Sequence, residues 1–327
     1  MIRPHHFHHL CIAATLVLSL GILRAAEPLT IAYSDWPGWA ALKIAEERGL
    51  FREAGVDVKL VWQDYGATLE GFQAGKSDAV ACTNGDMLVM GAAGKACKAI
   101  LVTDMSYGND MVIGKPGVTS IKDLKGKKVG IETGMVPHLL LLKALDAAGM
   151  KEGDVTIVKI VTVDAPKVLA AGDVDAVAAW YPIAGQVLSQ VEGSRPLFTS
   201  KNAPGLIYDV ICVSAESLST RRAEWAKVVS VWPKIVSTIT DPATRPEAVK
   251  IMAALVQADA ATYEKALPGT RLLDAAGNKR VMVRSDGIDS LFGSSVTVHR
   301  FNLQQQVYTN ELDPASFIDT TLVDELN

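Results

Sequence analysis

Histidine is scarce in this chain: there are 6 in 327 residues, and only His138 and His299 lie beyond residue 9. Zinc sites draw most of their ligands from His and Cys, so two isolated histidines argue against a His-based metal centre. Cysteine is as rare, with only Cys82, Cys97 and Cys212 beyond residue 11. An odd number of thiols permits at most one internal disulfide and does not say which pair would form it. Buried, apolar thiols are the simpler expectation.

The chain also lacks an excess of positive charge and the common catalytic motifs. It carries 32 Lys and Arg against 36 Asp and Glu, with no long run of either sign. A nucleic-acid partner would require a basic face, so we exclude one. The sequence has no nucleophilic serine motif, phosphate-binding glycine loop or metal-ligand cluster. We therefore expect neither an enzyme nor a bound cofactor or metal.

Long apolar runs are missing except near the start of the chain. The run 10–23 is too short to span a membrane as a mature helix. It follows Arg3 and precedes the small residues Ala25 and Ala26, which is the order of a secretory signal peptide. Cleavage would follow Ala26 or Ala25, and the cysteine inside the run does not have a lipid-attachment pattern. We predict a signal peptide at 1–26 and a soluble periplasmic protein.

Short β-rich runs then alternate with helical patterns. Strands are predicted over 29–33, 56–62 and 79–83, with helices over 39–48 and 68–74 between them. Alternation of strand and helix is typical of a parallel sheet with helices on its faces. The sequence therefore predicts an α/β fold.

The pattern recurs about 97 residues later. The segment 74–81 (AGKSDAVA) is repeated as 171–178 (AGDVDAVA), and in both a helix ends at Gly and a buried strand begins after Asp. Upstream of the second copy, a strand over 128–131 and a helix over 137–148 complete the same βαβ order. Such a repeat indicates two lobes of one design, although words as common as Ala-Gly and Asp-Ala also recur by chance.

The repeat and the later helices set the expected domain boundaries. A further strand is predicted over 208–214, and helices over 224–240, 246–260 and 300–309. If these pack back on the first lobe, the chain crosses between lobes twice and forms a two-strand hinge. We predict lobe I over 27–113 and 213–327, and lobe II over 114–212.

Several segments resemble a known family. The segment 121–130 (IKDLKGKKVG) resembles the opening of the second lobe in type II periplasmic binding proteins. Segments 49–56 (GLFREAGV) and 175–180 (DAVAAW) are similar to the nitrate/sulfonate/taurine branch of that group. The resemblance implies two lobes, each with a mixed, mainly parallel sheet flanked by helices, and a role as the binding component of an ABC importer. Its partners would then be an ABC permease and its ATPase at the inner membrane, and we expect a monomer.

Three shorter segments suggest a narrower likeness. Segments 33–39 (YSDWPGW), 83–86 (TNGD) and 107–110 (YGND) resemble binding proteins of importers encoded beside urea or guanidine carboxylases. The Gly-Ser pair that the family usually carries after the first strand of the second lobe is replaced by Thr133-Gly134-Met135. That departure concerns the ligand more than the fold.

Candidate ligand-binding residues lie in the loops at the carboxyl ends of the predicted strands, where open α/β sheets bind ligands. These loops contain no Lys or Arg, but several carboxylates, amides and aromatic rings. Carboxylates and ring faces attract a compact cation, amides give it directional hydrogen bonds, and a sulfonate would be repelled. The predicted ligand-binding residues are Asp35, Trp36, Asn84, Asp86, Tyr107, Asp110, Glu132, Thr133 and Trp180.

Most of these residues also have a structural explanation. Asp35 and Asp86 are suited to capping helices, and such caps contribute about 0.5–2 kcal/mol without a ligand. Glu132 could hold a local turn, and Asp110 could hold the crossover between lobes. Trp36 could be a core anchor, and for its neighbour Trp39 the core is the better explanation.

The leading hypothesis is a carrier of a small cationic or amide-like solute, such as guanidinium or urea, captured by closure of the two lobes. A carrier of sulfonate, taurine or nitrate is the alternative within the same family. Less favoured are an enzyme resembling the thiamine-pyrimidine synthases and a periplasmic sensor on the same fold.

Overall fold

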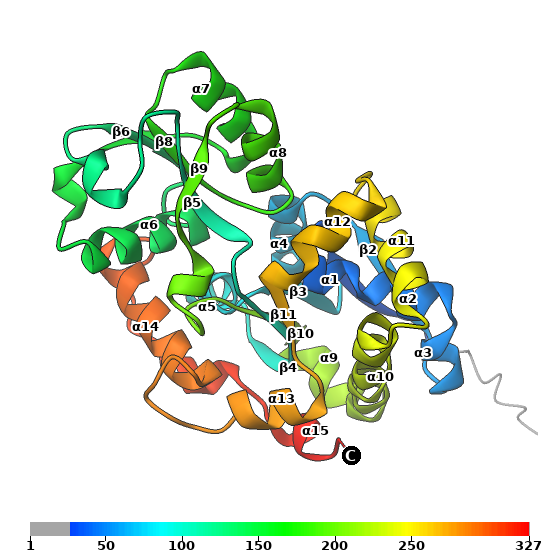
Figure 1. Ribbon diagram of the computed structural model, residues 1–327. Helices are drawn as coiled ribbons and strands as arrows, with labels where there is room; N and C mark the ends of the chain where they lie inside the picture. Colours follow the sequence, from blue (N-terminus) through cyan, green and yellow to red (C-terminus); the bar gives the residue numbers. More distant parts are fainter. Residues whose placement is uncertain (1–26, 327) are drawn as a thin grey trace, which may run out of the picture.

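The computed structural model describes residues 27–326, which form two α/β lobes (Figure 1). The predicted signal peptide at 1–26 lies outside the described residues. The first sheet has the order β11-β4-β10-β3-β1-β2, and the second has the order β7-β6-β8-β5-β9. The first is built from β1 (Leu29–Tyr33), β2 (Val58–Trp62), β3 (Ala79–Thr83), β4 (Cys97–Ser106), β10 (Tyr208–Ser214) and β11 (Thr270–Leu272). The second is built from β5 (Asp110–Gly114), β6 (Lys128–Ile131), β7 (Thr156–Lys159), β8 (Ala176–Trp180) and β9 (Arg195–Thr199).

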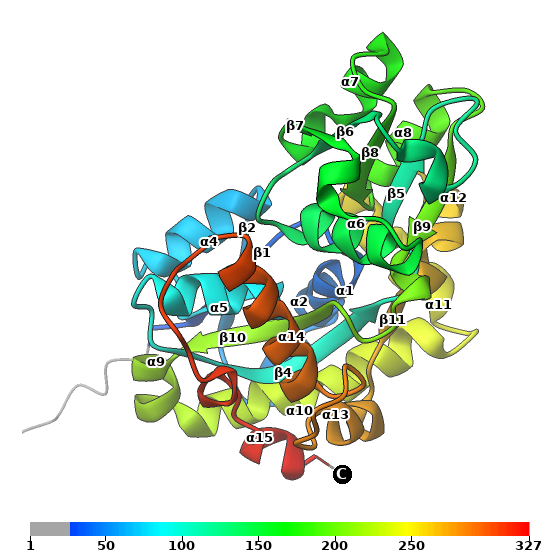
Figure 2. The same ribbon diagram turned by 90° about the vertical axis from the view of Figure 1, so that its left-hand side faces the viewer.

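Helices flank both sheets (Figures 1 and 2). Those of lobe II are α6 (Val136–Ala147), α7 (Ala165–Ala171) and α8 (Ile183–Gln190). Those before them in the chain are α1 (Pro37–Ala40), α2 (Leu42–Glu47), α3 (Leu50–Glu53), α4 (Tyr65–Gln73) and α5 (Asn84–Ala92). Those after them are α9 (Ala215–Thr220), α10 (Arg222–Thr240), α11 (Arg245–Leu255), α12 (Ala260–Ala266), α13 (Ala275–Val281), α14 (Leu291–Gln304) and α15 (Thr321–Asp324). Short 3₁₀ turns are η1 (Ile121–Leu124), η2 (Glu152–Asp154), η3 (Thr162–Asp164), η4 (Ser200–Asn202), η5 (Leu267–Gly269) and η6 (Pro314–Phe317).

The two sheets repeat one plan, which confirms the predicted α/β fold. Parallel pairing joins β2-β1-β3 in lobe I and β7-β6-β8 in lobe II. The next strand, β10 or β5, runs antiparallel to its neighbours in each lobe. The sheets are therefore mixed as predicted, with parallel order confined to one half of each.

The recurring Asp of the repeated segment has the same structural role in both lobes. Asp78 accepts a hydrogen bond from the backbone N–H of Thr30 at 2.8 Å, which ties the start of β3 to β1. Asp175 accepts one from the backbone N–H of Lys128 at 2.9 Å, which ties the start of β8 to β6. In both copies a glycine with positive φ precedes this Asp, 75° at Gly75 and 77° at Gly172, and ends the helix. The repeat in the sequence is therefore a repeat in the structure.

The chain crosses between the sheets at 107–109 and again at 200–207. The boundaries predicted at 113/114 and 212/213 fall inside β5 and β10, which belong whole to lobe II and lobe I. The first crossing lies earlier than predicted, because Gly108 already turns the chain with a φ of 133°. Ser200 joins the two crossings: its Oγ accepts from the Gly108 backbone N–H at 2.7 Å and forms a hydroxyl–hydroxyl hydrogen bond of 2.7 Å with Ser106.

A second contact between lobes lies where α14 packs beside α6 (Figures 1 and 2). The predicted bounds of the helix over 300–309 are wrong. The helix α14 begins nine residues earlier, where Ser290 caps it, and ends before Gln306, whose φ is 54°. Buried Leu139 of α6 packs in one apolar cluster with Val298 and Phe301 of α14.

His138, at the start of α6, supports this interface. Its Nδ1 accepts from the Gly134 backbone N–H at 3.2 Å, and its Nε2 lies 3.2 Å from Glu152. Gln305, next to α14, donates to Glu152 at 3.3 Å. This histidine is therefore part of the contact between the lobes.

The core of lobe I contains the three described thiols. Cys82, Cys97 and Cys212 are free and buried on the neighbouring strands β3, β4 and β10. Over the described part of the chain, no helix combines the length and the apolar character needed to cross a bilayer.

Candidate functional site

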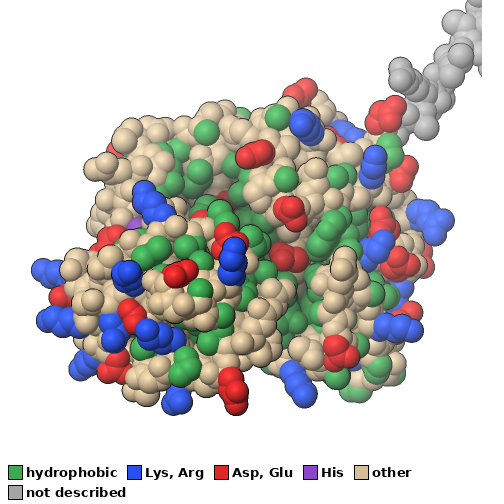
Figure 3. Space-filling view, turned by 90° about the horizontal axis from the view of Figure 1, so that it is seen from above, with side chains coloured by type: hydrophobic (Ala, Val, Ile, Leu, Met, Phe, Trp, Pro, Cys, Tyr) green, Lys and Arg blue, Asp and Glu red, His purple; other side chains and the backbone are tan. Residues whose placement is uncertain are grey.

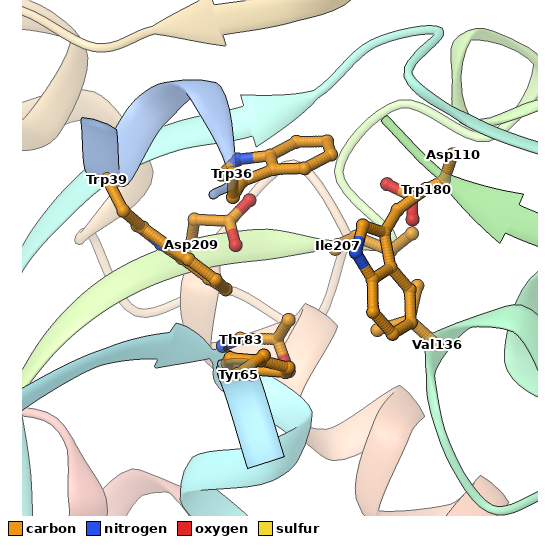
Figure 4. A pocket seen from close by; sticks show the side chains of 9 residues that line it. All are labelled: Trp36, Trp39, Tyr65, Thr83, Asp110, Val136, Trp180, Ile207 and Asp209. Carbon is orange, nitrogen blue, oxygen red and sulfur yellow. Dashed lines mark hydrogen bonds between the residues drawn. The ribbon is translucent and has the colours of Figure 1, made fainter. Parts of the chain in front are cut away.

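The cleft between the lobes contains three connected cavities at the carboxyl ends of the parallel strands. We call them the inner cavity, the mouth and the rear cavity. The space between their lining atoms, open solvent included, is about 320, 960 and 310 Å³, respectively. Tyr65 and Trp180 line both the inner cavity and the mouth, and Thr83, Val136 and Ile207 line both the inner and the rear cavity. The inner cavity is completed by Trp36, Trp39, Asp110 and Asp209 (Figure 4).

Aromatic rings from both lobes form the walls of the inner cavity. Trp39 stacks on Tyr65 with ring centroids 4.9 Å apart, and Trp180 of lobe II meets Tyr65 edge-on at 6.2 Å. Trp36 lies 6.4 Å from Trp39. The Nε1 of Trp39 is buried without a hydrogen-bond partner among the described residues, so it is a free donor at this wall. Trp39 thus belongs to the core, as predicted, and also faces the cavity.

Two aspartates lie side by side on neighbouring strands, one lining the inner cavity and the other behind it. Asp104 of β4 and Asp209 of β10 are cross-strand partners and are 0% and 2% exposed. Asp104 accepts from Trp36 Nε1 through Oδ1 and from Thr103 Oγ1 through Oδ2, both at 2.9 Å. Asp209 lines the inner cavity, and its Oδ2 has no hydrogen-bond partner among the described residues. Burial, followed by the negative charge of Asp104, raises the pKa of Asp209 well above its ordinary value.

The motif around Trp36 is shaped by Asp104. A Cβ on Gly38 would lie 1.6 Å from Oδ2 of Asp104, so only glycine fits between α1 and this carboxyl group. The Trp36 indole and the glycine together hold Asp104 in one place. The segment predicted to bind ligand therefore also fixes the acid behind the cavity.

Asp110 provides the carboxyl group of lobe II. It is 3% exposed, lines the inner cavity and accepts a hydrogen bond from Ser106 Oγ. Burial raises the pKa of Asp110 to about 7. Asp110 therefore lies in the predicted site and also takes part in the crossover contact that the alternative explanation assigned to it.

The mouth carries Asp35 and Glu132 from opposite lobes. Burial raises the pKa of Asp35 to about 6, and Ser34 Oγ is 3.4 Å from its Oδ1. Glu132 accepts from the backbone N–H of Thr162 at 3.0 Å and from its Oγ1 at 2.7 Å. Glu132 thus has the local turn role considered above, while its carboxyl group remains at the mouth.

Asp86 and Asn84 have structural partners. Asp86 is buried and accepts from Thr83 Oγ1 at 2.6 Å and from Tyr65 OH, and Thr83 caps α5 through the Asp86 backbone N–H. Asn84 donates to Ser294 Oγ at 3.1 Å and so ties α5 to α14. Both line the rear cavity, where their hydrogen bonds position Tyr65 and α14.

Tyr107 and Thr133 lie apart from the three cavities. The guanidinium of Arg271 lies 3.7 Å from the centroid of the Tyr107 ring, and Lys201 lies 5.6 Å from it. Tyr107 therefore packs beneath cations at the first crossing and lines none of the three cavities. Thr133 is half-buried and is absent from the linings of the three cavities, since the loop presents Gly134, Met135 and Val136 instead.

The prediction missed Asp209, Asp104, Tyr65, Val136 and Ile207. A signal for Asp209 was available, because an Asp opens both apolar runs, 110–113 (DMVI) and 209–212 (DVIC). Asp104 could not be found from sequence, since it lies within a buried strand whose pairing brings it to the cleft. Tyr65 precedes a predicted helix start and gave no distinguishing pattern.

The cleft is acidic and aromatic. None of the described residues lining the inner cavity, mouth and rear cavity is Lys or Arg. Seen from above, hydrophobic and acidic side chains gather around the hollow, and most Lys and Arg side chains lie toward the edges of the face (Figure 3). The described residues contain no group of three His, Cys, Asp or Glu placed to hold a metal ion.

A model of the NMT1/THI5-like family matches residues 36–237, which is more than half of the chain. Among curated proteins, a "Putative binding protein" of Brucella abortus is 33% identical over 168 residues. The match covers 51% of this chain and 52% of that protein, so it spans about half the length of the relative.

Solved structures share the fold at low sequence identity. The periplasmic aliphatic sulphonate binding protein SsuA of Escherichia coli has a TM-score of 0.76 at 19% identity, covering 91% of this chain and 99% of that one. The desulfurization enzyme DSZB has a TM-score of 0.64 at 17% identity, covering 90% and 98%. These structures share the two-lobed architecture described above.

Proposed function

The chain belongs to the NMT1/THI5-like family, and we propose that it is the periplasmic solute-binding component of an ABC importer. The carboxyl ends of both sheets meet at one cleft, and the two crossings and the α6–α14 contact join the lobes. Ligand contacts with both lobes would favour a closed form, which the permease and its ATPase would recognise. The predicted signal peptide is consistent with this location.

The proposed ligand is a small cationic or amide-like solute, such as guanidinium or urea. The observation that carries this proposal is the inner cavity, with two buried carboxyl groups, four aromatic rings and no Lys or Arg in its lining. A cation over a ring contributes about 0.5–2 kcal/mol, and a paired carboxylate adds a charge-assisted hydrogen bond. The free Trp39 indole N–H could donate to an amide carbonyl. The likeness to the urea and guanidine group supports the same choice.

A sulfonate is the second candidate, because the similar E. coli structure is named as an aliphatic sulphonate binding protein. An ionised Asp110 or Asp209 would repel a sulfonate at the inner cavity. If both kept their protons, their hydroxyl groups could instead donate to its oxygens. The two candidates therefore require opposite protonation states of the same carboxyl groups.

An enzyme is the less favoured function, although DSZB shares the fold. The cysteines of the described chain are buried in the core of lobe I and line none of the three cavities. His138 and His299 are engaged with Glu152 and with Tyr308 and Glu311. We expect the bound solute to be released unchanged.

A thermal-shift screen at pH 7.5 tests the ligand class. Guanidinium and urea should raise the melting temperature in proportion to ln(1 + [L]/Kd), while taurine, alkanesulfonates and nitrate should leave it unchanged. Stabilisation by sulfonates alone would replace the proposed ligand with the second candidate. Chemical conversion of a stabilising compound, followed by mass spectrometry, would instead identify an enzyme.

A further inference from the structure

Asp110 and Asp209 occupy equivalent positions in the two lobes. Asp110 opens the antiparallel strand β5 and pairs with Trp180, the last residue of β8. Asp209 lies at the start of the antiparallel strand β10 and pairs with Thr83, the last residue of β3. Because β8 and β3 are the two copies of the repeated segment, the paired aspartates correspond as well. Both side chains line the inner cavity, one from each lobe.

The surroundings of the two aspartates differ in one respect. Asp110 is provided with a hydroxyl donor, Ser106, whereas Asp209 faces a second acid, Asp104, and leaves Oδ2 without a partner. Both oxygens of Asp104 already accept hydrogen bonds from Trp36 and Thr103. Two buried carboxyl groups on neighbouring strands cannot both be ionised without a compensating charge. Without a ligand, the Asp104–Asp209 pair therefore retains a proton.

We infer that the ligand is a monocation that bridges Asp110 and Asp209, and that it replaces a proton held by the Asp104–Asp209 pair. The inference rests on the proposed function, because it concerns the same cleft. A guanidinium-like ion suits the geometry, since its N–H groups point outward in one plane and can donate to a carboxyl group of each lobe. The proton leaves to solvent as the cation enters, so the total charge of the cavity is unchanged.

Among the described residues that line the three cavities, no Lys or Arg neutralises the carboxyl groups in place of a ligand. The charged groups that raise the pKa of Asp209, in addition to its burial, are Asp104 on β4, Asp110 on β5 and Asp86 on α5. Tyr65 of α4 hydrogen-bonds to Asp86, and the Cys82 thiol of β3 is close enough for Asp209 to raise its pKa. Tyr263 of α12, whose hydroxyl has no hydrogen-bond partner among the described residues, is influenced by Asp104. All of these neighbours are neutral or negative, so a cation is the charge that the cavity lacks.

The test is calorimetry of the purified protein with guanidinium chloride at pH 5.5, 6.5 and 7.5, in buffers of different ionisation enthalpy. About one proton should be released per ion bound at pH 7.5 and nearly two at pH 5.5, because Asp110, whose pKa is about 7, is then protonated as well. The affinity should therefore rise at least about tenfold per pH unit. Asp209→Asn keeps the shape of the neutral carboxyl group but holds no titratable proton. It should abolish most of the proton release and lower the affinity at pH 7.5 at least tenfold.

Asp173→Asn is the matched control, because it removes one negative charge from an exposed side chain of lobe II. It should leave both the affinity and the proton count unchanged. Guanidinium binding without proton release, or with equal release in Asp209→Asn, would overturn this inference and leave the carrier function standing. Binding of urea but not guanidinium would do the same. Tighter binding of a sulfonate at low pH, with proton uptake, would overturn both the inference and the proposed ligand class.

Discussion

The two lobes share a strand order but differ in what stands behind their equivalent aspartates. In lobe II, Asp110 accepts from Ser106, and burial raises its pKa to about 7. In lobe I, Asp209 faces Asp104, and burial together with the charge of Asp104 raises the pKa of Asp209 well above its ordinary value. The repeated scaffold fixes where a carboxyl group meets the ligand, and the neighbouring strand fixes whether that group is charged.

The difference has a cost that lobe I bears. Burying an acid beside another acid is unfavourable unless one is neutral, and an unsatisfied buried oxygen costs about 1–3 kcal/mol. Lobe I compensates by holding Asp104 rigidly with Trp36 and Thr103. An unpaired buried carboxyl oxygen at a cleft is typical of a site where a ligand supplies the missing partner.

The largest expected effect comes from disturbing that support. Gly38→Ala would place a methyl group 1.6 Å from Asp104 Oδ2, so Asp104 or α1 must move. We expect the free energy of unfolding to fall by about 2–4 kcal/mol, as for other severe overpacking or loss of buried hydrogen bonds. Denaturant titration measures it.

Gly66→Ala is the matched control, because Gly66 also lies in the first turn of a lobe I helix but has open space around its Cβ position. It should be neutral or slightly stabilising, since alanine favours helix. Equal stability of the two variants would show that Asp104 does not pack closely against Gly38 of α1.

Much of the fold could be predicted because it follows local patterns. The strands over 29–33, 79–83, 128–131 and 208–214 were predicted with their observed bounds, since each is a short β-rich run with a clear turn before or after it. The predicted lobe boundaries fell inside β5 and β10 because the sequence shows these β-rich runs more clearly than the points where the chain changes sheet. The 300–309 helix was misplaced because its true cap, Ser290, lies in a polar segment that gave no apolar period.

The site was predictable in part, for a different physical reason. Trp36, Asp110 and Trp180 sit at strand ends, so topology alone directs them to the inner cavity. Tyr107 occupies a similar sequence position, yet Arg271 from a distant strand covers it. Asp104 and Asp209 meet only through the pairing of β4 with β10, which no local pattern records.

The second expected effect is a pH dependence of stability to which the aspartates of the two lobes contribute differently. The folded pKa values of Asp35 (about 6), Asp110 (about 7) and Asp209 (well above the ordinary value) are raised above those of the unfolded chain. The folded state therefore binds more protons, and stability falls as pH rises from about 4 through 7. We expect the melting temperature without ligand to drop by about 5 °C between pH 4.5 and 7.5, measured by scanning calorimetry.

The aspartate variants assign that fall to a lobe. Asp209→Asn should remove more of the decline than Asp110→Asn, because Asp209 lies opposite a second acid, Asp104, whereas Asp110 has the donor Ser106 to offset its burial. Asp173→Asn should retain the decline of the unaltered protein. A melting temperature that rises over this pH range would contradict the buried, protonated pair.

The smallest expected effect is at Tyr107, in the first crossing between the lobes. Tyr107→Leu removes the ring beneath Arg271, a contact worth about 0.5–1 kcal/mol at an exposed site, and leaves the cavity lining intact. Affinity for guanidinium, measured by calorimetry, should stay within about twofold of the unaltered protein, while the melting temperature falls by about 1–3 °C. Trp180→Leu is the contrast, because that ring lines both the inner cavity and the mouth, and its loss should weaken binding about tenfold. A loss of affinity in Tyr107→Leu as large as in Trp180→Leu would return Tyr107 to the binding site and show that the ligand reaches the crossing itself.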